Sequence, residues 1–336
     1  MWFARKEKNQ GTDNSVEHSC ESLLASIASN GVELSLTELM RYQNKCALIN
    51  LVARKNVQGK QSGNYLSRSK GRGMEFDEVR HYQTGDDIRA IDWRVTARTG
   101  TTHTKLFREE IERPVLIATD LSTSMHFGSQ LLFKSVQAAH LASLVAWHAK
   151  SRGDRLGGLV FNNDKHVELK PRSRKAGVLH YLHALTLLAK PNNTEQHPED
   201  FDSHCARLRH LAKPGSLVYL ITDGQAFINY DDNQQHALRH LAQISQHCEL
   251  VVCLINDSLE FTLPVSTRKL TVTLTDGIDK QQLTLGHKNT EISYQQQASL
   301  MHTQKRQRLQ ETGARIIEFS AGQTLEQQLK NAGALL

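Results

Sequence analysis

Three oxygen-bearing side chains stand at alternate positions directly after a short apolar run. The run is Val115–Ala118, and the three residues are Asp120, Ser122 and Ser124. One carboxylate and two hydroxyls are hard oxygen ligands of the kind that Mg²⁺ prefers, and Mg²⁺ usually keeps several of its waters. A site with so few protein ligands leaves a coordination position for a carboxylate from outside. The spacing therefore predicts a metal-binding loop that serves protein interaction.

A further acidic residue follows a later apolar run. Leu217–Thr222 has the pattern of a buried strand, and Asp223-Gly224 comes directly after it. Ligands of open α/β sheets gather at the carboxyl ends of the strands, so we expect Asp223 to lie near Asp120. The alternative is structural in both cases. Ser and Asp also cap helices, and Asp-Gly is common in turns.

The elements that must position these residues alternate along the chain. Predicted strands cover 115–118, 155–161, 166–170, 217–222, 249–256 and 314–319. Predicted helices cover 129–150, 176–189, 200–212, 233–247, 292–312 and a closing helix from 324. This alternation predicts an α/β fold, a doubly wound and mostly parallel sheet with helices on both faces, preceded by a smaller N-terminal segment.

Three regions are predicted. Residues 1–72 are a polar N-terminal region with short helices and a flexible linker, and residues 73–113 are a mixed charged and apolar segment leading into the sheet through an edge strand at 105–111. Residues 114–336 are the α/β domain. A hairpin insertion is expected near 268–285, where alternating apolar residues flank Asp276-Gly277.

Composition narrows the function. The chain has 336 residues, of which 39% are hydrophobic and 23% charged, so it can form a substantial core. The formal net charge is +6, but basic residues are interleaved with acids, as in Arg80–Arg98. A nucleic-acid binder would concentrate them on one element. We therefore expect no nucleic-acid partner. Nucleic-acid binding through the basic stretch 54–72 is kept as an alternative function.

Cysteine usage and hydropathy indicate the compartment. The five cysteines are scattered, odd in number and form no C-x-x-C pair. This pattern is typical of a reducing environment and argues against both a disulfide framework and a structural zinc site. No apolar run reaches the roughly 18–20 residues that a membrane-spanning helix needs. The N-terminus also lacks the apolar core of a signal peptide. We therefore expect a cytoplasmic protein without a transmembrane segment.

The two acidic motifs resemble a known metal site. Asp120-x-Ser122-x-Ser124, together with Ile221-Thr-Asp223-Gly224, is similar to the metal-ion-dependent adhesion site of von Willebrand factor type A domains. The resemblance implies that Asp120, Ser122 and Ser124 line a Mg²⁺ ion directly or through water, with Asp223 close by. It also implies a von Willebrand factor A-like fold.

One expected ligand departs from that pattern. The adhesion site takes a Thr from a loop between the edge hairpin and the next helix, and here Pro171–Gly177 contains none. Ser173 is the hydroxyl available in that stretch, and it is kept as a weak candidate ligand.

A second resemblance lies upstream. Four stretches are similar to the domain-of-unknown-function family 58, bacterial proteins with a von Willebrand A-like domain: Gly73–Arg80, Tyr82–Arg89, Ile91–Arg98 and Lys105–Glu109. That family is typically associated with MoxR-type AAA+ ATPases. The resemblance implies a non-enzymatic adaptor that works with such an ATPase, in a chaperone-like role, on an unknown client protein.

The charged residues of this segment allow two interpretations. Asp86, Asp87, Arg89, Asp92 and Arg94 could form a partner surface, but we favour an intramolecular network of salt bridges and packing that joins this segment to the α/β domain. The aromatic side chain between them, Trp93, is interpreted as a packing anchor.

An enzyme is the main functional alternative. A Mg²⁺-dependent phosphoryl-transfer or hydrolytic enzyme would need a nucleophile or a positioned base beside the metal. Ser122 and Ser124 are better suited as ligands, and neither acidic loop is expected to contribute a histidine. No catalytic residue is therefore predicted.

Overall fold

The computed structural model describes residues 13–48, 74–109, 113–190, 200–228, 236–264, 270–275 and 280–331. The chain forms two compact units. Met1–Gly59 and Arg113–Leu336 make up the first, called the α/β unit below. Lys60–Glu112 makes up the second, called the ribbon unit.

A six-stranded sheet is the centre of the α/β unit. Its strands, in order across the sheet, are β10 (Arg315–Ser320), β7 (Glu249–Asn256), β6 (Leu217–Thr222), β3 (Pro114–Asp120), β4 (Arg155–Phe161) and β5 (His166–Arg172). All neighbours are parallel except β5, which returns antiparallel to β4. The predicted α/β fold is confirmed, and the strand order is compatible with a von Willebrand factor A-like sheet.

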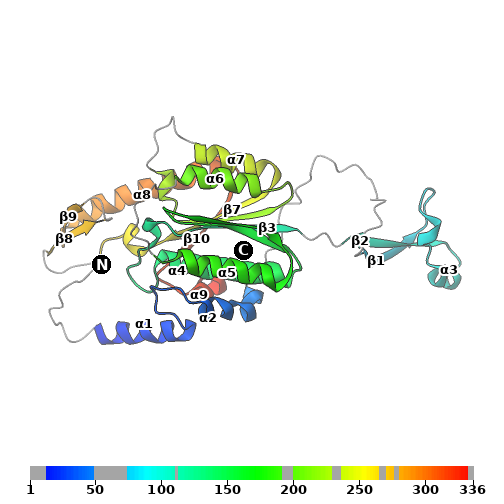
Figure 1. Cartoon of the computed structure of the whole chain (residues 1–336), viewed down its shortest axis with the longest axis horizontal. Helices are drawn as coiled ribbons and strands as arrows, with labels where there is room; N and C mark the ends of the chain where they lie inside the picture. The colour runs from blue at the N-terminus through cyan, green and yellow to red at the C-terminus, as the bar shows by residue number, and fades with distance from the viewer. Residues whose placement is uncertain are drawn as a thin grey trace. The chain divides into compact units, whose positions relative to one another are not determined.

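Helices cover both faces of this sheet. They are α4 (Lys134–Ser151), α5 (Arg174–Leu188), α6 (Phe201–Leu211), α7 (His236–His247), α8 (Lys288–Glu311) and α9 (Leu325–Asn331). Figure 1 shows α4 and α5 on one face and α6 and α7 on the other. None of the helices in the described ranges combines the length and the apolar composition that crossing a membrane requires.

The central strand shows why the sheet is buried on both sides. Val115 and Ile117 belong to the core under α4 and α5, whereas Leu116 and Ala118 belong to the core under α6 and α7. Successive strand side chains point to opposite faces, so an unbroken apolar run is needed where both faces are covered. The same pattern correctly predicted the bounds of β4, β6 and β7.

Helix starts were predicted less accurately. The helix expected from residue 129 begins at Lys134. The reason is that Ser129 is held in the preceding loop by the carboxylate of Asp257, which accepts bonds from its backbone N (2.9 Å) and its Oγ (2.5 Å). Sequence periodicity carries no information about such a partner from a distant loop.

The hairpin near the C-terminal part of the chain is present. β8 (Leu270–Thr275) pairs antiparallel with β9 (Lys280–Leu285), as predicted for 268–285. The following helix, α8, is longer than predicted because it begins at Lys288. Gly313 takes the left-handed backbone conformation (φ 77°) expected of a residue that ends a helix.

The N-terminal helices pack against α4. They are α1 (Asp13–Ile27), α2 (Leu36–Met40) and the 3₁₀ helix η1 (Arg41–Leu48). Buried Glu38 accepts a hydrogen bond at 2.5 Å from His140 Nε2, and Ser143 Oγ donates to Leu39 O at 2.7 Å. These helices therefore belong to the same compact unit as the sheet. The linker expected over 58–73 lies outside the described residues.

The ribbon unit is built from two strands and two short helical turns. Its elements are β1 (Met74–His81), η2 (Ile88–Ala90), α3 (Trp93–Thr99) and β2 (His103–Glu109). β2 pairs with β1 in a two-stranded sheet of its own, so the edge strand predicted at 105–111 is not part of the central sheet.

The two interpretations of the charged segment fare differently. Arg80 pairs with Asp86 at 2.7 Å, and Lys105 lies 3.7 Å from Asp92, so both ion pairs form within the ribbon. A network that joins the ribbon to the α/β domain stays a prediction. Trp93, however, is 67% exposed. The described residues of the ribbon give it no core to enter, so the prediction that it is a packing anchor is not confirmed within this unit.

We expect Tyr181→Phe to lower the free energy of unfolding by about 1–2 kcal/mol. Tyr181 is fully buried on α5, and its hydroxyl lies 2.7 Å from Thr119 Oγ1 and donates to Ile117 O at 3.2 Å. Removing it leaves a buried hydroxyl of the central strand without this partner. Urea unfolding measures the effect. Tyr82→Phe is the control because Tyr82 is only half-buried, and equal losses in the two variants would contradict the prediction.

Candidate functional site

Asp120 and Asp223 lie side by side at the carboxyl edge of the sheet. β3 and β6 are parallel neighbours with Thr119 opposite Ile221, so the two aspartates end adjacent strands. The chain runs from β3 to β4 on one side and later returns to β6 on the other, which makes this pair of strands the topological switch point of the sheet. Open α/β sheets bind their ligands at such a point.

Backbone and hydroxyl donors hold the Asp120 carboxylate. Its Oδ1 accepts from Ser122 N at 2.9 Å and its Oδ2 accepts from Thr222 Oγ1 at 2.7 Å. The hydroxyl oxygens of Ser122 and Ser124 are 3.3 Å apart. Burial, and then the charge of Asp223, raise the pKa of Asp120 to about 6. The structure thus brings together Asp120, Ser122, Ser124 and Asp223, the four residues that the sequence analysis predicted to lie close together.

Asp223 has a counter-ion that the sequence did not reveal. Lys134 Nζ lies 2.8 Å from Asp223 Oδ2 and 2.6 Å from Glu260 Oε1, and the lysine is itself buried. Burial acts to raise the pKa of Asp223, but Lys134 beside it holds the pKa below its usual value. Lys305 Nζ adds a bond to the backbone oxygen of Asp223 at 2.7 Å.

The position of Lys134 in its helix explains why it needs acidic partners. It follows the apolar run Leu131–Phe133 and is the first residue of a helix. A cation is unfavourable at a helix N-terminus, because that end carries a partial positive charge. A lysine in this place therefore needs an acidic partner, which the sequence alone could not name.

Ser173 does not join the site. It follows β5, whose Arg172 pairs with Leu156, and Leu156 in turn is level with Val115 at the start of β3. Val115 and Asp120 are five residues apart on an extended strand, which is about 16 Å. Ser173 therefore lies at the opposite edge of the sheet, and the suggestion that it ligates the same metal was wrong.

The other end of α5 does lie near the aspartate edge. Asn162 Nδ2 donates to Leu188 O at 3.2 Å, and His126 Nε2 lies 3.1 Å from Ala189 O. The chain thus leaves α5 beside the Ser122–Ser124 loop. The next residues, 191–199, lie outside the described part; their sequence contains one hydroxyl, Thr194.

The donor chemistry fits a hard divalent cation. Among the described residues, no cation is bonded to the Asp120 carboxylate, although it is buried beside a second carboxylate. If all five are charged, Asp120, Asp223 and Glu260 against Lys134 and Lys305 leave one negative charge. The described residues also contain no group of three or more His, Cys, Asp or Glu side chains suited to a metal. A Mg²⁺ ion here would depend on Asp120, the two serine hydroxyls and water, which suits its preference for a partly hydrated site.

A histidine does lie near this loop, contrary to expectation. His126 Nδ1 is 3.0 Å from Ser122 O, and its other ring nitrogen faces Ala189 O. Both nitrogens therefore face main-chain carbonyls rather than the serine hydroxyls. Neither is placed to act as a base for Ser122 or Ser124.

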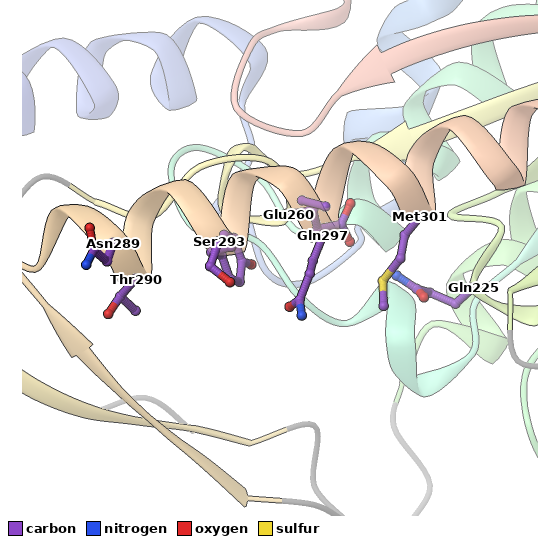
Figure 2. Close-up of a pocket in the computed structure, with 9 residues that line it drawn as sticks. Gln225, Glu260, Asn289, Thr290, Ser293, Gln297 and Met301 are labelled. Atoms are coloured by element: carbon purple, nitrogen blue, oxygen red, sulfur yellow. The ribbon is translucent and has the colours of Figure 1, made fainter.

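A groove of about 570 Å³ runs along α8 next to the site. Figure 2 shows Asn289, Ser293 and Gln297 along one side of the helix. Glu260 lines the groove and also pairs with Lys134. Gln225 lines it too, and its backbone N donates to Asp223 Oδ1 at 3.0 Å. A ligand in the groove would therefore be next to the Asp223 network.

Fold and site together define a doubly wound α/β protein with buried carboxylates at its switch point. The chain belongs to the family described as "Protein of unknown function DUF58", whose profile matches residues 78–307.

Two mycobacterial proteins are similar to this chain in sequence. The uncharacterized proteins Rv1480 of Mycobacterium tuberculosis and Mb1516 of Mycobacterium bovis are each 26% identical to this chain over 220 residues. The match covers 64% of this chain and 65% of each relative, slightly less than two thirds of their length.

One solved structure is similar over most of its own length. The conserved hypothetical protein BatB from Bacteroides thetaiotaomicron is 14% identical, with a TM-score of 0.39. The similarity covers 66% of this chain and 98% of that one.

Proposed function

We propose that this protein is a non-enzymatic interaction module that binds Mg²⁺ at the Asp120 edge and, through the ion, an acidic side chain of a partner. The observation that supports this most is the Asp120 carboxylate, which is buried next to Asp223 and is bonded by no cation of the described residues. Burying a carboxylate without a counter-charge is costly, and a divalent ion would offset that cost.

The charge balance of the site favours an acidic ligand. The five charged groups sum to one negative charge, so a bound Mg²⁺ would leave one positive charge. A single carboxylate from a partner would neutralise it and could take an open coordination position. The partner proposed from the family resemblance is a MoxR-type AAA+ ATPase, acting with this protein on a client in a chaperone-like role.

The test is a Mg²⁺ titration of the whole chain by calorimetry, repeated with Asp120→Ala. We expect binding to the wild type and its loss in the variant. Asp164→Ala is the matched control. Asp164 lies in the turn after β4, at the same edge of the sheet, but it contacts neither Asp120 nor Asp223. Equal Mg²⁺ binding by wild type and Asp120→Ala would refute the proposed site.

The proposed partner is tested separately. The purified MoxR-type ATPase of the same organism is captured on immobilised protein, with Mg²⁺ and with a chelator. We expect retention that depends on both Mg²⁺ and Asp120. Retention that is the same in every condition would show that the ATPase binds elsewhere.

A further inference from the structure

The described residues of the ribbon unit form no hydrophobic core of their own. Of the side chains described between residues 74 and 109, Thr104 is buried and no apolar one is. A two-stranded ribbon alone is marginally stable in water, because it buries too little apolar surface. Such a unit gains stability when it docks onto another surface.

Local hydrogen bonds and ion pairs hold the described residues of the unit together instead, and they engage the carboxylates of Asp86 and Asp92. Asp86 accepts from Arg80 Nη2 at 2.7 Å and from Gln83 N at 2.9 Å. Asp92 Oδ1 accepts from the backbone N of Arg94 and of Val95 at the start of α3. These hydrogen bonds hold the pKa of both carboxyls below the usual range, so both stay charged and engaged.

The arginines of the same stretch are not used in this way. Arg89, Arg94 and Arg98 are exposed, and in the described part of the chain their side chains make no ion pair or hydrogen bond. Arg94 and Arg98 lie one turn apart on α3, and Trp93 directly precedes Arg94 in the same helix. Ile88 next to Arg89 is 65% exposed. Exposed aromatic, aliphatic and arginine side chains therefore share one short stretch, Ile88–Arg98.

This composition is typical of a protein-binding surface. Tryptophan and arginine are the residues most enriched among those that dominate binding energy. The exposed guanidinium groups would pair with carboxylates of a partner. The exposed apolar side chains would contact an apolar side chain that lies between those carboxylates. A nucleic acid fits less well, because Lys60–Glu112 carries ten basic and nine acidic residues and so has almost no net positive charge.

The rest of the chain carries a net positive charge. Outside Lys60–Glu112 the protein has five more basic than acidic residues. Neither the α/β unit nor a second copy therefore offers a net negative charge to the arginines. We propose that Ile88–Arg98 is a docking surface for an acidic segment of a different protein, one with carboxylates flanking an apolar side chain. This surface is distinct from the Asp120 site.

A selection from random peptides tests the proposal and needs no named partner. A peptide library displayed on phage is selected on the immobilised full-length protein, and a consensus peptide is then synthesised. We expect Asp or Glu next to an aromatic or branched apolar residue. Arg94→Glu/Arg98→Glu should weaken the binding of that peptide on the order of tenfold.

Two control variants separate this surface from other charge effects. Arg174→Glu/Lys175→Glu makes the same change of charge on exposed residues of α5 and should leave the affinity unchanged. Asp120→Ala should also leave it unchanged. Loss of peptide binding in Asp120→Ala would assign the peptide to the metal site and overturn the present inference while supporting the proposed function.

Fluorine NMR locates the contact on the full-length protein. After labelling with 5-fluorotryptophan, the peptide should shift the resonance of Trp93, which Trp93→Phe assigns. Trp147 is fully buried in α4, so its unchanged resonance shows that each variant is folded. The inference is overturned if no acidic consensus is enriched, if charge reversal has no effect, or if a labelled oligonucleotide binds with steep salt dependence and loses affinity in the arginine variant.

Discussion

Replacing Lys134 by methionine is expected to lower the free energy of unfolding by about 3–5 kcal/mol. The ammonium of Lys134 is buried between the carboxylates of Asp223 and Glu260, at 2.8 and 2.6 Å. Methionine keeps most of the side-chain volume but leaves both acids without this counter-ion. Breaking a buried pair by removing one partner is strongly destabilising for that reason. Urea unfolding in chelator measures the change.

Mg²⁺ adds a second readout to the same variant. If the ion binds at the aspartate edge, it should recover more stability in Lys134→Met than in the wild type, because the local negative charge is larger. Lys175→Met is the control, since Lys175 is exposed at the start of α5. A loss below about 1 kcal/mol in Lys134→Met, typical of a surface substitution, would contradict the buried ion pair.

Asp120→Asn should stabilise the metal-free protein at neutral pH, by about 1–3 kcal/mol. Burial and Asp223 raise the pKa of Asp120 to about 6 in the folded state, against about 3.9 in an unfolded chain. As the pH rises from about 4 to about 6, the unfolded chain releases its proton first, so the wild type loses stability. The asparagine variant has no such titration, and it can still accept the bond from Ser122 N.

Unfolding in chelator at several pH values tests the sign. The stability difference between Asp120→Asn and wild type should be near zero at about pH 4, should grow up to about pH 6 and should then stay level. Mg²⁺ should stabilise the wild type above that range and leave the variant unchanged. A variant that is less stable than the wild type at neutral pH in chelator would show that the charge of Asp120 is already compensated.

The central strands of the sheet were predictable because they are buried on both faces. β4, β6 and β7 are continuous apolar runs, and their bounds follow from the sequence. The start of α4 was not predictable, because a bond between Ser129 and Asp257 holds the preceding loop. The ribbon was not predictable either: β2 alternates like an edge strand, and only its pairing with β1 shows which sheet it joins.

The site was predictable where its residues follow their own strands. Asp120 and Asp223 each end a buried run, so topology alone brings them together. Lys134 could not be placed, because it reaches Asp223 from an element 89 residues earlier in the chain. Glu260 could not be placed either, because it joins the site only by pairing with Lys134. Ser173 was misplaced for a topological reason: β5 returns antiparallel and carries the chain to the opposite edge.

The packing of the N-terminal helices on α4 constrains the order of folding during synthesis. Glu38 and His140 are 102 residues apart, and Leu39 and Ser143 are 104 apart. α2 and η1 therefore have no docking partner until α4 has emerged from the ribosome, after the whole ribbon unit. Closing so long a loop costs conformational entropy, and a ribbon that folds early shortens the free chain that must be closed. The ribbon is thus an insertion in the α/β unit, and it must be synthesised before the helices that precede it can dock on α4.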